Sequence, residues 1–150
     1  MKKIFFLILC FTFSNIAIGQ TVDDSVKMVV NKMFAAMKSA DRVMLVNCFA
    51  DSAILQTVDK SKEGKVFVRN EDIGDFAKQI STLPKGAADE RITFDIVKVD
   101  ADLATVWASY KFYFKGKFSH CGVNSFQLVL INGQWKIQYI IDTRRKDNCE

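Results

Sequence analysis

His120 has the clearest potential for chemistry. It is the only histidine among the 150 residues, and histidine is the side chain whose ordinary pKa allows proton exchange near neutral pH. General acid–base catalysis by a histidine is helped by a carboxylate that orients the ring. Asp142 is the candidate carboxylate, but it shares a sheet face with His120 only if a β-bulge between Gly122 and Thr143 shifts the register. Without that bulge, the sequence favours a structural or ligand-orienting role for His120.

The cysteines indicate less chemistry than His120. A zinc site made from His120, Cys121 and Cys149 would lack a fourth ligand, and the chain has no Cys-x-x-Cys or His-x-x-x-His spacing. Successive residues of a strand point to opposite faces, so His120 cannot activate Cys121 as a nucleophile. The chain also has no Gly-rich phosphate loop. We therefore expect no metal site and no cofactor.

Three helices are expected to support these residues. Thr21 can cap a helix over residues 22–39, in which apolar residues recur at three- and four-residue spacing. Asp41 can cap a second, short helix over residues 43–49. A third, amphipathic helix is expected to follow Asn70 and to end before the only proline.

Six strands are expected between and after the helices. Short β-branched segments separated by a polar loop indicate a first hairpin. From Arg91 onward the apolar pattern changes to a period of two, and Asn132-Gly133 is a strong signal for a tight hairpin turn. The expected strands cover residues 53–58, 65–69, 91–99, 103–114, 118–131 and 134–143.

This order of elements predicts an α+β fold in which one curved antiparallel sheet wraps around the helices. A sheet curled around the first helix would form a cone with a cavity at its open end. The tight turn fixes the pairing of the last two strands and sets which residues face the cavity. The expected pairs are Leu128 with Ile137, Phe126 with Tyr139, Asn124 with Ile141 and His120 with Arg145.

The strand over residues 103–114 is apolar on both faces, so both of its faces should be covered. A second copy of the chain could cover the outer face, which would make the protein a homodimer. The first two strands or the C-terminal tail could also cover it, and the sequence does not decide between these alternatives.

Composition and the N-terminus bound the function. The net charge of +4 is too small to suggest a nucleic-acid binder. Residues 1–19 have a basic start, an apolar run and small residues at the end, which is typical of a secretory signal peptide. The run is too short for a membrane anchor. We therefore expect a secreted or periplasmic protein made of one domain over residues 20–150.

The three cysteines of this domain allow at most one disulfide. Cys121 with Cys149 is the first choice, because the expected strand pairing brings the C-terminal tail past Cys121.

The same order of elements and the ending Gly133-Gln134-Trp135-Lys136-Ile137 resemble the NTF2-like superfamily of cone-shaped α+β domains. The segments Phe118–Val123 and Ile141–Arg145 are similar to exported bacterial members of the SnoaL-like or putative lumazine-binding type. The resemblance implies a pocket at the open end of the cone and frequent dimers. It implies no single reaction, because the superfamily includes isomerases, cyclases, dehydratases and many binders.

Small-molecule binding in the cone is therefore the leading hypothesis, with no assigned reaction. One alternative is an isomerase, lyase or cyclase that uses His120 with Asp142. Another is a protein-interaction module that uses the outer sheet face. The expected ligand-binding residues are Trp107, Tyr110, His120, Asn124, Phe126, Tyr139 and Arg145.

Overall fold

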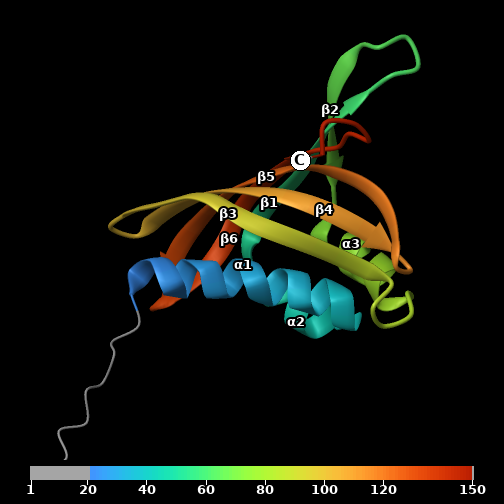
Figure 1. Ribbon diagram of the computed structural model, residues 1–150. Coiled ribbons are helices and arrows are strands. Elements are labelled where there is room, and N and C mark those ends of the chain that lie inside the picture. Colours follow the sequence, from blue (N-terminus) through green and yellow to red (C-terminus); the bar gives the residue numbers. More distant parts are fainter. Residues whose placement is uncertain (1–20, 150) are drawn as a thin grey trace, which may run out of the picture.

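The computed structural model describes residues 21–149, which form three helices and six strands (Figure 1). The elements are α1 (Val22–Ser39), α2 (Arg42–Val46), β1 (Phe49–Lys60), β2 (Val66–Glu71), α3 (Ile73–Ser81), β3 (Ala88–Asp100), β4 (Leu103–Phe114), β5 (Lys117–Ile131) and β6 (Gln134–Thr143). All of the expected elements are present, and the differences lie in their bounds.

The helices begin where short polar side chains can cap them. Thr21 forms both halves of a capping box at the start of α1, and Asp41 accepts a hydrogen bond from a backbone N–H of α2. Helix α2 ends earlier than predicted, since Phe49 begins β1 instead of ending the helix. The predicted cap of α3 is also wrong: Asp72 caps this helix, and Asn70 belongs to β2.

The strands form one mixed sheet in the order β2-β1-β6-β5-β4-β3. Strand β1 runs parallel to β6, whereas the other neighbours are antiparallel. The sheet arches over α1, and the β1–β2 hairpin extends beyond it (Figure 1). The predicted α+β cone is confirmed, except that the sheet is not purely antiparallel.

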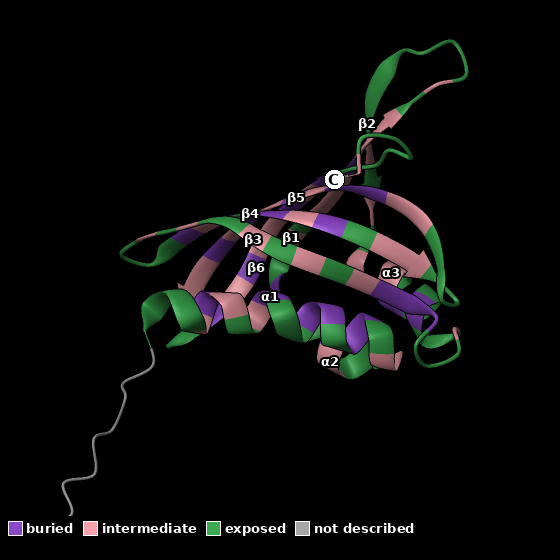
Figure 2. Ribbon diagram, in the orientation of Figure 1, coloured by how far each residue is buried: buried purple, intermediate pink, exposed green. Residues whose placement is uncertain are grey.

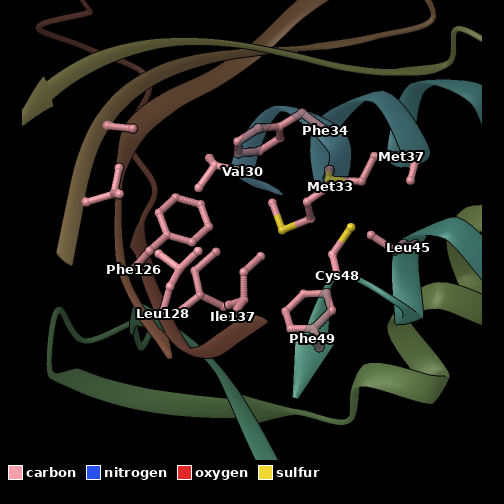
Figure 3. Close-up of a cluster of buried hydrophobic side chains, with 14 of the residues drawn as sticks. Val30, Met33, Phe34, Met37, Leu45, Cys48, Phe49, Phe126, Leu128 and Ile137 are labelled. Atoms are coloured by element: carbon pink, nitrogen blue, oxygen red, sulfur yellow. The ribbon is translucent and has the colours of Figure 1, made fainter. Parts of the chain in front are cut away.

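The core lies between the concave face of the sheet and the helices. Buried residues alternate with exposed ones along α1 and along the central strands (Figure 2). Phe34 of α1 meets Phe126 of β5 edge to face, with ring centroids 6.2 Å apart. Leu128 and Ile137 are fully buried beside them, and Cys48 and Phe49 close the other side (Figure 3).

A β-bulge changes the predicted register of β5 and β6. Leu128 pairs with Ile137 as expected, but Gln127 pairs with Tyr139, so Gln138 is an extra residue in β6. The predictions for the residues beyond this bulge are wrong, because every later side chain of β6 changes face. Phe126 therefore pairs with Ile140, and Asn124 pairs with Asp142.

A second bulge, in β3, places an additional apolar side chain on the outer face of strands β3 and β4. In β3 the register shifts between Phe94 and Ile96, and Ile96 is 49% exposed. Trp107 on the neighbouring strand is 47% exposed. Neither the first strands nor the C-terminal tail covers this face, so that alternative is wrong. The homodimer stays a prediction.

The C-terminal tail is joined to the sheet by the predicted disulfide between Cys121 and Cys149, which is thereby confirmed. Cys48 is buried and free. The predicted signal peptide, residues 1–19, lies outside the described residues. Within residues 21–149, no helix is long and apolar enough to span a membrane.

Candidate functional site

A cavity of about 60 Å³ opens between α1, α3 and the β1–β6 side of the sheet. Its volume is enough for several water molecules or for part of a small ligand. Apolar side chains make up one side and polar side chains the other. The lining residues are Met33, Phe34, Met37, Phe49, Leu55, Phe76 and Ile140 on the apolar side, and Glu71, Glu90, Asn124, Asp142 and Arg144 on the polar side.

Glu90 reaches the cavity from the start of β3. Asn124 Nδ2 of β5 donates a hydrogen bond of 2.7 Å to Glu90 Oε1. Burial raises the pKa of the Glu90 carboxyl to about 7, and the nearby charge of Asp142 acts in the same direction. The hydrogen bond from Asn124 and the charge of Arg144 offset only part of this shift. Glu90 can therefore gain or lose a proton near neutral pH.

Asp142 faces the cavity because of the bulge in β6. Its Oδ2 atom accepts a hydrogen bond of 2.8 Å from Arg144 Nε, and a second Arg144 nitrogen lies 3.3 Å from Thr57 Oγ1. The residue is only 8% exposed. Its Oδ1 atom is buried and has no hydrogen-bond partner among the described residues. A buried carboxylate oxygen without a partner is costly, so a water molecule or a ligand group that donates to it would be stabilising.

Tyr110 lies behind the polar side of the cavity. Its hydroxyl group donates to the Thr143 carbonyl oxygen at 2.8 Å and has a longer contact of 3.5 Å with Asp142 Oδ2. Burial and the charges of Glu90 and Asp142 raise the pKa of Tyr110, so the phenol stays neutral. Gly122 makes this approach possible, since a Cβ atom there would overlap the Thr143 carbonyl and would lie 2.8 Å from the Tyr110 ring.

His120 lies outside the cavity lining. Its ring packs edge to face on Tyr110, with centroids 5.7 Å apart, and lies 5.0 Å from Phe112. Its Nδ1 atom is 3.0 Å from Ser119 Oγ, and no hydrogen bond joins the ring to Asp142. Burial, followed by the charge of Arg144, lowers the pKa of His120, so the ring is neutral at pH 7. Asp142 thus faces inward, as the predicted acid–base pair of His120 and Asp142 requires, but no hydrogen bond connects the two residues.

The other predicted ligand-binding residues fall into three groups. Asn124 lines the cavity, and Phe126 lies in the core beneath it. Tyr110 supports the cavity from behind. Trp107, Tyr139 and Arg145 are not among the lining residues: Trp107 lies on the outer face, the Tyr139 hydroxyl donates to Gln56 Oε1 at 2.6 Å, and Arg145 pairs with Cys121.

Sequence reasoning missed Glu90 and Glu71, and the predicted register placed Arg144 on the outer face, although Arg144 or Arg145 was a candidate to hold an anionic ligand. Glu90 has the same parity as Ile92 and Phe94, which pack against the core. Extending their period-two pattern back by one position would have placed Glu90 on the inner face. Arg144 could not be found in this way, because its facing depends on the bulge at Gln138.

The acidic residues of the site do not form a metal centre. Among the described residues, no group of three or more His, Cys, Asp or Glu side chains is arranged to hold a metal ion. The arrangement consists of three carboxyl groups, one guanidinium and one amide beside an apolar wall. Such a site can bind the polar end of a small molecule and exchange a proton with it.

Known structures share this architecture. An NTF2-like protein of unknown function from Shewanella baltica matches with a TM-score of 0.65 and 15% identity, over 82% of this chain and 93% of that one. A domain of unknown function with a cystatin-like fold from Nostoc punctiforme matches with a TM-score of 0.65 and 18% identity, over 87% and 82% of the two chains. An NTF2-like protein of unknown function from Methylobacillus flagellatus matches with a TM-score of 0.62 and 18% identity, over 83% and 94%.

These matches and the geometry define a class of fold, a cone in which a curved sheet and helices enclose a cavity. The fold of this chain is NTF2-like, as the resemblance predicted. No protein-family model matches the sequence, and a comparison with curated proteins finds no match either.

Proposed function

We propose that this protein binds a small, partly apolar molecule in the cavity of the cone. The observation that carries the proposal is the Oδ1 atom of Asp142, which is buried at the cavity wall without a hydrogen-bond partner. Leaving such an atom unpaired costs about 1–3 kcal/mol. A ligand that donates a hydrogen bond to this oxygen would recover that cost.

The apolar wall opposite Asp142 indicates the chemical character of the other end of the ligand. Met33, Phe34 and Met37 of α1 and Phe76 of α3 contribute only apolar surface to the cavity. Methionine side chains adapt their shape to irregular apolar groups. The ligand is therefore polar where it meets Asp142 and apolar where it meets the helices.

Two neighbouring residues of β1 provide a test with a matched control. Leu55 lines the cavity, whereas Ile54 is 50% exposed on the other face of the strand. A Leu55→Trp variant should fill the cavity, and Ile54→Trp should leave it open. Native mass spectrometry of protein purified from its own cells should show a retained mass that disappears on denaturation. We expect Leu55→Trp to lose this mass and Ile54→Trp to keep it. A bare polypeptide mass together with no saturable binding of small amines, alcohols or acids would refute the proposal.

Proton-transfer catalysis is the second candidate function, and the inward position of Asp142 favours it. Glu90 replaces His120 as the group that exchanges the proton, because Glu90 lines the cavity and its pKa is raised to about 7. The reaction would be an isomerisation, elimination or cyclisation that needs no cofactor. If a retained ligand is identified, its conversion by the wild type and not by Glu90→Gln would support this function. Equal conversion by both would exclude Glu90 from the reaction.

We also infer that the protein is exported and forms a homodimer. The basic and apolar pattern of residues 1–19 supports export. Exposed Ile96, Trp107 and Leu103 on strands β3 and β4 support an interface. An intact mass that begins near Gln20 would agree with export, and the full-length mass in the cell envelope would contradict a cleaved signal peptide.

A further inference from the structure

We propose that the ligand of this cavity is an organic cation, namely a small primary ammonium compound with an apolar tail. The inference rests on the proposed function, because it names the ligand class for the same cavity. It follows from the balance of charges and of hydrogen-bond donors at the polar wall.

The carboxyl groups of the polar wall exceed its cations. Glu71 has its own partner, Arg69, at 3.6 Å. Glu90 and Asp142 are then left with Arg144 as the one cation that lines the cavity. The nearby cations Lys38 and Arg91 do not help, because both pair with Asp89, at 2.9 Å and 3.0 Å. The site therefore has room for one additional positive charge.

Each donor group of the polar wall already has at least one acceptor within the chain, although the Arg144 guanidinium uses only two of its three nitrogens. The Tyr110 hydroxyl donates to the Thr143 carbonyl, the Asn124 amide to Glu90, and the Arg144 guanidinium to Asp142 and Thr57. The acceptor Asp142 Oδ1 is buried and has no donor among the described residues. The charges of Glu90 and Asp142 disfavour a carboxylate ligand beside Arg144, whereas a group that brings several donors and a positive charge fits. An ammonium group brings three donors and one positive charge.

The remaining walls agree with an alkyl tail. The polar lining residues come from β2, β3, β5, β6 and the residue that follows β6, and the helices supply only Met33, Phe34, Met37 and Phe76. No charged side chain of α1 or α3 lines the cavity. His120 of β5 packs against Tyr110 and Phe112 of β4 outside the cavity lining, and burial lowers its pKa, so it adds no charge at pH 7.

This arrangement predicts that affinity depends on pH. An ammonium ion favours the ionised form of Glu90, whose pKa without a ligand is raised to about 7 chiefly by burial. Glu90 is largely protonated at pH 6 and largely ionised at pH 8. The affinity for an ammonium ligand should therefore rise about tenfold between pH 6 and pH 8, while the affinity for a neutral ligand should stay the same or fall.

Three probes with similar tails test the ligand class. n-Butylammonium, 1-butanol and butyrate would be titrated into the ¹⁵N-labelled protein at pH 8, and binding would be followed through the side-chain amide signal of Asn124. We expect n-butylammonium to bind at least tenfold more tightly than 1-butanol, and butyrate to bind most weakly. Equal or tighter binding of 1-butanol or butyrate would overturn the inference and leave the proposed function standing. No saturable shift with any probe would overturn both.

A pair of variants locates the charge that matters. Glu90→Gln keeps an oxygen that accepts the hydrogen bond of Asn124 but removes the charge. We expect it to reduce n-butylammonium affinity to that of 1-butanol and to abolish the pH dependence. Glu63→Gln, in the exposed loop between β1 and β2, is the matched control and should behave as wild type. If Glu90→Gln binds n-butylammonium as tightly as wild type, the inference is wrong. If this variant does not fold, the ranking of the probes and the pH dependence of the wild type decide.

Discussion

The raised pKa of Glu90 predicts how the stability of the protein changes with pH. The pKa is shifted from 4.5 to about 7 by burial, so between these values the folded state binds more protons than the unfolded state. The free energy of unfolding then falls as pH rises through this window. One pKa unit corresponds to about 1.4 kcal/mol, so the full shift corresponds to a loss of about 3 kcal/mol. Glu90→Gln cannot lose a proton and lacks this contribution.

Urea unfolding followed by tryptophan fluorescence at pH 5 and pH 8 measures this effect in wild type and in Glu90→Gln. Relative to the variant, wild type should lose about 2.5 kcal/mol between the two pH values, because pH 5 already lies inside the window of the shift. His120 acts in the opposite direction, because its lowered pKa makes stability rise with pH toward 6.5. Its effect is present in both proteins and cancels in the difference. Parallel curves for the two proteins, or a gain of wild type over the variant at pH 8, would refute the buried-carboxyl interpretation.

Three further predictions concern the frame around the cavity. Gly122→Ala should lower the unfolding free energy by about 3 kcal/mol, because the added methyl group overlaps the backbone of β6. Gly74→Ala in α3 should change the unfolding free energy by less than about 1 kcal/mol. Similar urea midpoints for the two variants would contradict the close packing at Gly122. Reducing the Cys121–Cys149 bond, which spans 28 residues, should cost about 3 kcal/mol by the same assay, and an unchanged midpoint in dithiothreitol would show that the bond does not stabilise the fold. Sedimentation equilibrium should give a dimer mass for wild type and a monomer mass for Trp107→Lys, and a monomeric wild type would remove the proposed interface.

The elements of the fold could be predicted because their signals are local. Thr21 and Asp41 cap helices through their own side chains, and Asn132-Gly133 forms the hairpin turn between β5 and β6. The errors at Phe49 and Asn70 arose where one element directly follows another. There the chain ends a helix or a strand for reasons of tertiary packing, which the local pattern does not contain.

The candidate site could be predicted only in part, because one extra residue in β6 decides which side chains of that strand face the cavity. Gln138 has no turn or glycine signal that marks a bulge, yet it moves Asp142 and Arg144 to the concave face and Tyr139 to the other. The inward facing of Asn124 could be predicted because it lies on β5, whose alternation from Leu128 is unbroken, and its role in ligand binding stays a prediction. Glu90 was missed because it precedes the obvious alternation of β3.

The parallel pairing of β1 with β6 also bears on how the protein folds. Phe49 at the start of β1 is a partner of Ile137 in β6, so this edge of the sheet joins segments that are far apart in the sequence. Such non-local pairing slows folding, because a large loop must close before the contacts form. During synthesis the β1–β2 hairpin has to wait for the last strand. The cavity lies between α1, β1 and β6, so it is assembled among the last features of the chain, and a product truncated before β6 would lack the cavity.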